Sequence, residues 1–191
     1  DVTKGITGTI PVANGGTGIA SGTSGQFLKF TGTTTIASAA DNAGKILQVT
    51  SNKIVGERNS NSTSYVATNI YHNITPASSS NKVLVIVALP SIYSSNRNRP
   101  TRIRLYRHTA LVSVGGSTAG TEINGDFHMN YQGGSDMQGT KTVYTELDSP
   151  SSTSAVYYQI YFNSHNSDNT SYIGQGGGSP VANVTLMEVS A

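Results

Sequence analysis

Apolar and polar residues alternate in short runs through most of this chain, and turn-forming residues separate the runs. Beyond the polar stretch Glu57–Ser64 the runs recur at fairly regular spacing. Several short strands with turn signals between them predict a β-sandwich or jelly roll. The predicted strands are Tyr65–Asn73, Lys82–Tyr93, Thr101–Arg107, Ala110–Val114, Asp126–Gln132, Lys141–Leu147, Ala155–Asn163 and Asn183–Val189.

Two of these runs carry more information than the others. Val83–Leu89 is apolar at every position, so both faces of that strand must be covered. In Val156–Phe162, alternate positions place Tyr157, Gln159 and Tyr161 on one face. Tyrosine and glutamine together provide apolar area with polar tips, a composition favoured at interfaces, and this predicts a subunit contact. The alternative is an ordinary central strand under a loop.

The region before residue 58 contains an internal repeat. Gly25–Thr31 matches Gly44–Thr50, and each copy precedes a second short apolar segment, Thr34–Ala37 or Asn52–Val55. Each unit is predicted to be a β-hairpin. An isolated hairpin is marginally stable, so these units need partners, most economically copies of themselves. Residues 1–24 are open to another interpretation, a flexible glycine- and serine-rich linker.

A glycine-rich motif begins the chain. Thr7–Gly18 reads T-G-T-I-P-V-A-N-G-G-T-G, and its glycines leave little side chain to pack. This run resembles a motif of bacteriophage tail fibres, T-G-x-[LI]-P-V-A-N-G-G-T-G. The resemblance extends through the two repeats, and more loosely to Ile74–Val85 and Val184–Val189. It implies a parallel homotrimer with a stalk at residues 1–57 and a tip domain at residues 58–191.

Composition and charge narrow the possible functions. Charged residues make up 12% of the 191 residues, and the formal net charge of +2 is too small for a nucleic-acid binder. No apolar run reaches the length of about 20 residues that spans a bilayer, so membrane insertion is not expected. The absence of cysteine suits folding in a bacterial cytoplasm.

Catalytic and metal-binding patterns are absent from the sequence. Glu122 with Asp126, or Glu146 with Asp148, could in principle act as a glycosidase pair, but solvated carboxylates are the more common meaning. The four histidines have no metal-binding spacing, and no nucleophile or nucleotide motif accompanies them. We therefore expect no enzymatic activity, no metal and no cofactor; the alternative for metal is a single histidine that binds an axial ion together with its symmetry mates.

Candidate receptor-binding residues lie in three polar loops. Five of the six arginines fall within residues 97–107, and their planar guanidinium groups suit phosphate or carboxylate. Arg102 and Arg104 are more readily explained by pairing between subunits with Glu122, Glu146 or Asp148, or by a solvated face. Two further loops mix aromatic, amide and carboxylate groups, as sugar sites do. The predicted site residues are Arg97, Arg99, His128, Tyr131, Asp136, His165, Asn166, Asp168 and Tyr172.

These patterns predict an all-β tail-fibre tip that adsorbs to a bacterial host. Its expected partners are two further copies of the chain, upstream fibre segments, and a surface glycan such as lipopolysaccharide or another outer-membrane receptor. The expected location is the virion, after assembly in the host cytoplasm. Two alternatives are a purely structural trimerisation tip and a glycan-cleaving tailspike enzyme.

Overall fold

The chain divides into two compact units in a computed structural model. The model describes residues 22–33, 35–39, 44–96, 99–116, 120–123, 127–129, 140–174 and 179–191, with only the backbone at 127–129 and 140. The units are Asp1–Ala43 and Gly44–Ala191, so the division comes earlier than the predicted boundary at residue 57. The glycine-rich motif Thr7–Gly18 lies outside the described residues.

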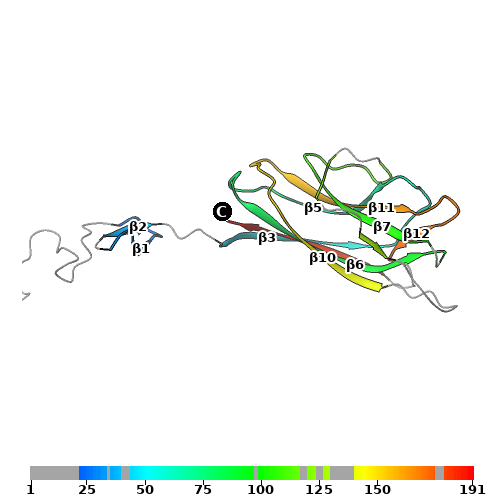
Figure 1. Cartoon of the computed structure of the whole chain (residues 1–191), viewed down its shortest axis with the longest axis horizontal. Helices are drawn as coiled ribbons and strands as arrows, with labels where there is room; N and C mark the ends of the chain where they lie inside the picture. Colours follow the sequence, from blue (N-terminus) through cyan, green and yellow to red (C-terminus); the bar gives the residue numbers. More distant parts are fainter. Residues whose placement is uncertain are drawn as a thin grey trace, which may run out of the picture. The chain divides into compact units, whose positions relative to one another are not determined.

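The first unit contains the predicted hairpin. Strands β1 (Phe27–Phe30) and β2 (Ile36–Ala39) pair antiparallel, with Phe30 opposite Ile36 (Figure 1). Gly25 precedes the hairpin with a φ of 79°, a conformation that glycine adopts without strain. Phe27 and Leu28 are exposed, and 74% of the surface of Phe30 is accessible. The described hairpin has no apolar core of its own.

The prediction of a second hairpin at Gly44–Val55 is wrong. These residues form one long strand, β3 (Ile46–Val55), which pairs along its length with β13 (Val181–Val189). Ser51 and Asn52 look like a turn in the sequence, but their side chains bond instead to Asn183 and to the Tyr71 carbonyl. A partner far along the chain thus overrides a local turn signal.

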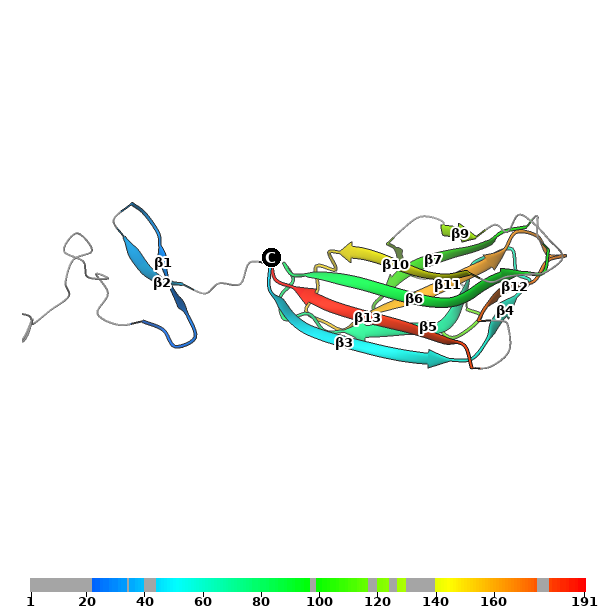
Figure 2. The same ribbon diagram turned by 90° about the horizontal axis from the view of Figure 1, so that it is seen from below.

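The second unit consists of two antiparallel sheets that share one core, consistent with a sandwich (Figure 2). One sheet has the order β3-β13-β6-β12-β4 with β10 on the other edge of β6, and the second has the order β5-β11-β7-β8 with β9 also paired to β7. This order is consistent with a jelly roll. The remaining strands are β4 (Arg58–Ser60), β5 (Val66–Ile74), β6 (Lys82–Ser94), β7 (Thr101–His108), β8 (Thr121–Glu122), β9 (Phe127–Met129), β10 (Thr140–Asp148), β11 (Val156–Ser164) and β12 (Ser171–Ile173).

Most of the predicted strands are present in this fold. Seven of the eight predicted runs correspond to β5, β6, β7, β9, β10, β11 and β13. Ala110–Val114 is not a strand, and the short strands β4, β8 and β12 were not predicted. Strands of two or three residues carry too little alternation to stand out in a sequence.

The core lies where the inward positions of both sheets meet. Val83, Val85 and Val87 of β6 point inward and are fully buried, as are Tyr158 and Ile160 of β11. Alternate residues of a strand point to opposite faces, so one face of each strand supplies the core. Burial of apolar side chains of this size stabilises the fold by about 1.5 to 3 kcal/mol each.

The Tyr-Gln-Tyr face of β11 does not support the predicted subunit contact. Tyr161 and Gln159 are buried by the chain itself, beneath the segment that includes Val112. The Gln159 amide donates to the carbonyls of Val112 and Thr68, at 2.9 and 2.6 Å, and accepts from the Val112 amide at 3.3 Å. The alternative interpretation, a central strand under a loop, is therefore correct at these two residues.

A buried carboxylate fastens the end of the sandwich at which β3 begins. Glu188 of β13 is fully buried and accepts hydrogen bonds from Gln48, from the Ala77 amide and from the Asn81 side chain. Although burial alone would raise the pKa of Glu188, these donors outweigh it, and the pKa lies below its ordinary value. The charged form of Glu188 therefore stabilises the folded state.

We expect Glu188→Gln to lower the free energy of unfolding at neutral pH by about 2 to 3 kcal/mol. The new amide would place an N–H donor against neighbours that are themselves donors. A carboxylate whose pKa is lower when folded stabilises above its unfolded pKa of 4.5 and loses this effect as the pH falls through the folded value. The gap between wild type and variant should hence shrink below pH 4.5.

Urea unfolding at several pH values measures this gap. Burial also lowers the pKa of His72 and His108, which weakens both proteins as the pH falls below 6.5. That contribution cancels in the difference between wild type and variant. A gap that does not change with pH would contradict the role assigned to Glu188.

Candidate functional site

Two loops lie at the end of the sandwich opposite to the C-terminus and the start of β3 (Figures 1 and 2). One loop joins β6 to β7, and the other joins β11 to β12. In the first loop residues 97 and 98 are outside the described part, while the second is described throughout. These are two of the three loops in which the sequence predicts receptor-binding residues.

One buried amide joins the two loops. Asn169 is 1% exposed, and its side-chain oxygen accepts from the hydroxyls of Ser94 and Ser95 and from the Asn96 amide, at 2.8, 3.0 and 2.9 Å. Its side-chain nitrogen donates to the Ser164 hydroxyl at 2.8 Å. Sequence reasoning missed Asn169, because nothing local distinguishes it from the surrounding asparagines and serines.

Arginines from β7 and the loop before it contact the β11–β12 loop. Arg99 Nη1 donates to the Asn166 side-chain oxygen at 3.0 Å, and the Asn166 amide nitrogen donates to the His165 carbonyl at 2.8 Å. Arg102 Nη2 lies 3.1 Å from His165 Nδ1, which accepts because a guanidinium can only donate. These contacts fix the orientation of groups that are only half-buried.

The structure thus brings together several of the predicted site residues. Asn166 contacts both Arg99 and the His165 carbonyl, and Asp168 is exposed in the same loop. Tyr172 lies on the adjacent strand β12, opposite Tyr93 of β6, with the ring centroids 5.4 Å apart. Burial and the proximity of Tyr172 raise the pKa of Tyr93.

The remaining predicted residues are only partly located. The backbone of His128 lies in β9 opposite Arg102, whose side chain contacts the β11–β12 loop. Nothing further is described for the His128 side chain. Arg97, Tyr131 and Asp136 lie outside the described residues.

The other two arginines of β7 pair within the chain. Arg104 lies 2.7 Å from Glu122, and Arg107 lies 2.6 Å from Asp148. Asp148 also accepts from the buried Tyr158 hydroxyl at 2.8 Å, and burial is the main reason that the pKa of Tyr158 is raised. The predicted acidic partner is therefore correct for Arg104, although its pair with Glu122 forms within the chain, whereas Arg102 contacts His165 instead of a carboxylate.

The β6–β7 and β11–β12 loops, together with Tyr93 and Tyr172 beside them, are called the loop cluster below, and their side chains offer chemistry for recognition. Guanidinium, imidazole, amide and carboxylate groups stand beside a tyrosine pair, and together they can hydrogen-bond hydroxyls and pack against an apolar face. Within the part of the chain that the structure describes, no three His, Asp or Glu residues gather as a metal site. The described residues also form no helix long and apolar enough to cross a membrane.

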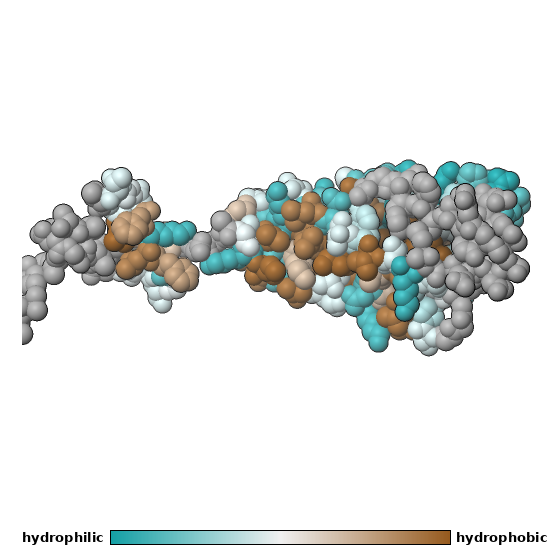
Figure 3. Space-filling model, turned by 60° about the horizontal axis from the view of Figure 1, so that its bottom comes forward, coloured by the Kyte–Doolittle hydropathy of each residue, from teal (hydrophilic) through white to brown (hydrophobic). Residues whose placement is uncertain are grey.

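A second surface feature is a row of apolar side chains on the outer face of the larger sheet. Val49, Met187, Leu84 and Leu147 lie side by side across β3, β13, β6 and β10. Val49 and Leu147, the two ends of this apolar row, are exposed. Figure 3 shows hydrophobic side chains gathered on this face. The outer face of β6, predicted to need cover, is therefore only half-buried in the single chain.

Comparisons with known proteins add little to this description. No protein-family model matches the chain, and no curated protein matches it significantly. One solved structure that resembles it is that of infectious bursal disease virus Gx strain, at 12% identity and a TM-score of 0.31. The match covers 83% of this chain and 44% of that chain, and a score this low carries no argument.

We expect Asn169→Ala to lower the free energy of unfolding by about 2 to 3 kcal/mol, because it removes the four hydrogen bonds that this buried side chain makes to Ser94, Ser95, Asn96 and Ser164. Hydrogen exchange should accelerate in both loops, at residues 94–96 and 164–171. Asn166→Ala is the control, because Asn166 is only half-buried and should cost less than about 1 kcal/mol. Equal effects of the two substitutions in chemical denaturation would contradict the joining role of Asn169.

Proposed function

We propose that this protein is the distal part of a bacteriophage tail fibre, whose tip adsorbs to a bacterial surface glycan such as lipopolysaccharide. The carrying observation is the loop cluster at the end of the sandwich away from the start of β3. The resemblance of Thr7–Gly18 to the tail-fibre motif supplies the biological setting. The protein then belongs to the virion and connects to upstream fibre segments.

The chemistry of the loops supports a glycan as the receptor. Arg99 and Asn166 present a guanidinium and an amide side by side, and Asp168 adds an exposed carboxylate. Such groups hydrogen-bond sugar hydroxyls, and arginine also suits the phosphates and carboxylates of lipopolysaccharide. Because each fibre repeats the site, weak single contacts add up to high avidity.

Two apolar surfaces support a homotrimer. The hairpin β1–β2 exposes Phe30, and a two-stranded hairpin is marginally stable in water. The apolar row crosses four strands of the larger sheet beside the start of β3. Further copies of the same chain, running parallel, would cover both surfaces at once, and this makes a second and third copy the economical occupants.

Ion pairing favours binding over cleavage. Glu122 and Asp148, each a member of a carboxylate pair considered for glycosidase activity, are held by Arg104 and Arg107. Carboxylate oxygens engaged by a guanidinium are less available to act on a glycosidic bond. A purely structural tip remains the second candidate, because the apolar row by itself would serve such a role equally well.

Substituting Arg99, His165 and Asp168 together with alanine should reduce the adsorption rate to host cells by at least tenfold. The matched control substitutes Ser79, Ser80 and Lys82, which are exposed and lie at the opposite end of the sandwich. Adsorption is measured with purified fibre protein that competes with intact phage. An unchanged rate in the loop variant would favour the structural tip, and shortening of purified host polysaccharide would favour an enzyme.

Light scattering tests the assembly. We expect the wild-type protein to have three times the chain mass of 19.9 kDa, and Val49→Lys with Leu147→Lys to shift it toward the monomer. Lysines at both ends of the apolar row would place charges in the subunit contact. Leu111→Lys with Val114→Lys is the control, because these exposed residues lie outside the row. A monomeric wild type at micromolar concentration would contradict the trimer.

A further inference from the structure

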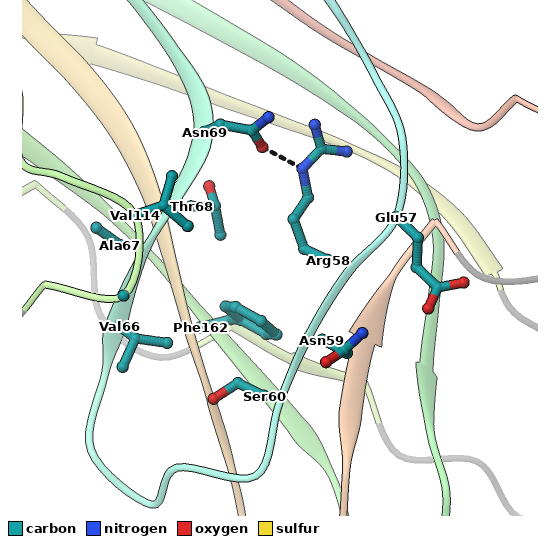
Figure 4. Close-up of a pocket in the computed structure, with 11 residues that line it drawn as sticks. Glu57, Arg58, Asn59, Ser60, Val66, Ala67, Thr68, Asn69, Val114 and Phe162 are labelled. Carbon is teal, nitrogen blue, oxygen red and sulfur yellow. Dashed lines mark hydrogen bonds between the residues drawn. The ribbon is translucent and has the colours of Figure 1, made fainter.

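A pocket of about 390 Å³ lies between β4 and β5, outside the loop cluster (Figure 4). Val66, Val114 and Phe162 supply an apolar wall, and Asn59, Ser60 and Asn69 supply amide and hydroxyl groups. Ligand pockets range from about 300 to 1,000 Å³, so this one suits a single sugar-sized group rather than an extended chain.

Two charged residues line this pocket, Glu57 and Arg58, and Arg58 is the cation. Its surface is only 7% exposed, and its guanidinium donates to three neutral oxygens. Nε donates to the Asn69 side chain, Nη1 to the Gly56 carbonyl, and Nη2 to the Val55 carbonyl at 3.1 Å. Among the described residues no carboxylate pairs with Arg58, and the neighbouring Glu57 points away from it (Figure 4).

A buried cation with neutral partners is an unusual arrangement. Burial disfavours the charged form and lowers the pKa of Arg58, although arginine stays protonated at any ordinary pH. Buried charges are normally paired with an opposite charge, because their desolvation is costly. A guanidinium has five N–H donors, and three are used here, so the two terminal nitrogens each retain one hydrogen.

We propose that this pocket binds one sugar residue that carries a carboxylate, as a uronic acid does. The carboxylate would approach Arg58, which offers the opposite charge and unused donors. The sugar ring would pack on Val66 and Val114, which are accessible at the pocket wall, while its hydroxyls bond to Asn59 and Asn69. The inference does not rest on the proposed function, because the pocket shares no residue with the loop cluster.

Saturation-transfer difference NMR with methyl glucuronide tests the proposal on the whole chain. Saturable binding in the millimolar range is expected, and methyl glucoside, which lacks the carboxylate, should bind at least about tenfold more weakly. Raising the salt concentration should weaken the glucuronide alone. Equal binding of the two glycosides, or the absence of saturable binding, would overturn the proposal.

Two substitutions place the binding in this pocket. Val114→Trp fills the pocket from its exposed rim without removing an Arg58 contact, and it should abolish the glucuronide signal. Arg58→Met should do the same, and if it fails to fold, Val114→Trp decides alone. Lys82→Ala, which removes an exposed cation outside both the pocket and the loop cluster, should leave glucuronide binding unchanged. A folded Val114→Trp protein that still binds glucuronide would refute the assignment, whatever the outcome for adsorption.

Discussion

Strand β6 is the element on which the rest of the second unit depends, because it is paired on both edges and apolar on both faces. Its inner valines form the middle of the core, and its edges hydrogen-bond to β10 on one side and to β13 and then β12 on the other. A strand held in this way tolerates few alternatives. The last residue of β6, Ser94, also donates a hydrogen bond from its hydroxyl to the Asn169 side-chain oxygen.

The same strand explains why one sheet presents polar chemistry at its end and apolar surface on its face. Leu84 belongs to the apolar row, whereas Tyr93, nine residues later, packs on Tyr172 beside the loop cluster. The apolar row and the loops that present hydrogen-bonding groups are thereby held on one sheet. In the proposed fibre tip, assembly and recognition would occupy separate surfaces of the sandwich.

Buried polar side chains connect turns and loops that apolar contacts alone would not fix in position. Glu188 fastens one end of the sandwich, Asn169 joins the two loops at the other end, and Arg58 ties the β3–β4 turn to β5. The first two are satisfied by several partners each. Arg58 also has three partners, but it keeps two unused N–H donors and a pocket lies beside it, and this difference motivates the sugar-acid proposal.

Alternation, β-rich composition and flanking glycines by themselves determined much about this protein, since together they identified the all-β class, the first hairpin and most long strands. Those features depend on local period and turn residues, which the sequence displays directly. Only tertiary structure decided that residues 44–55 join β13, that Val112 covers Gln159, and that Asn169 joins the loops. Each of these outcomes depends on a partner distant in sequence, so no local pattern could predict it. Composition nevertheless pointed to two loops that the structure brings together, because polar residues concentrate in loops whatever the fold.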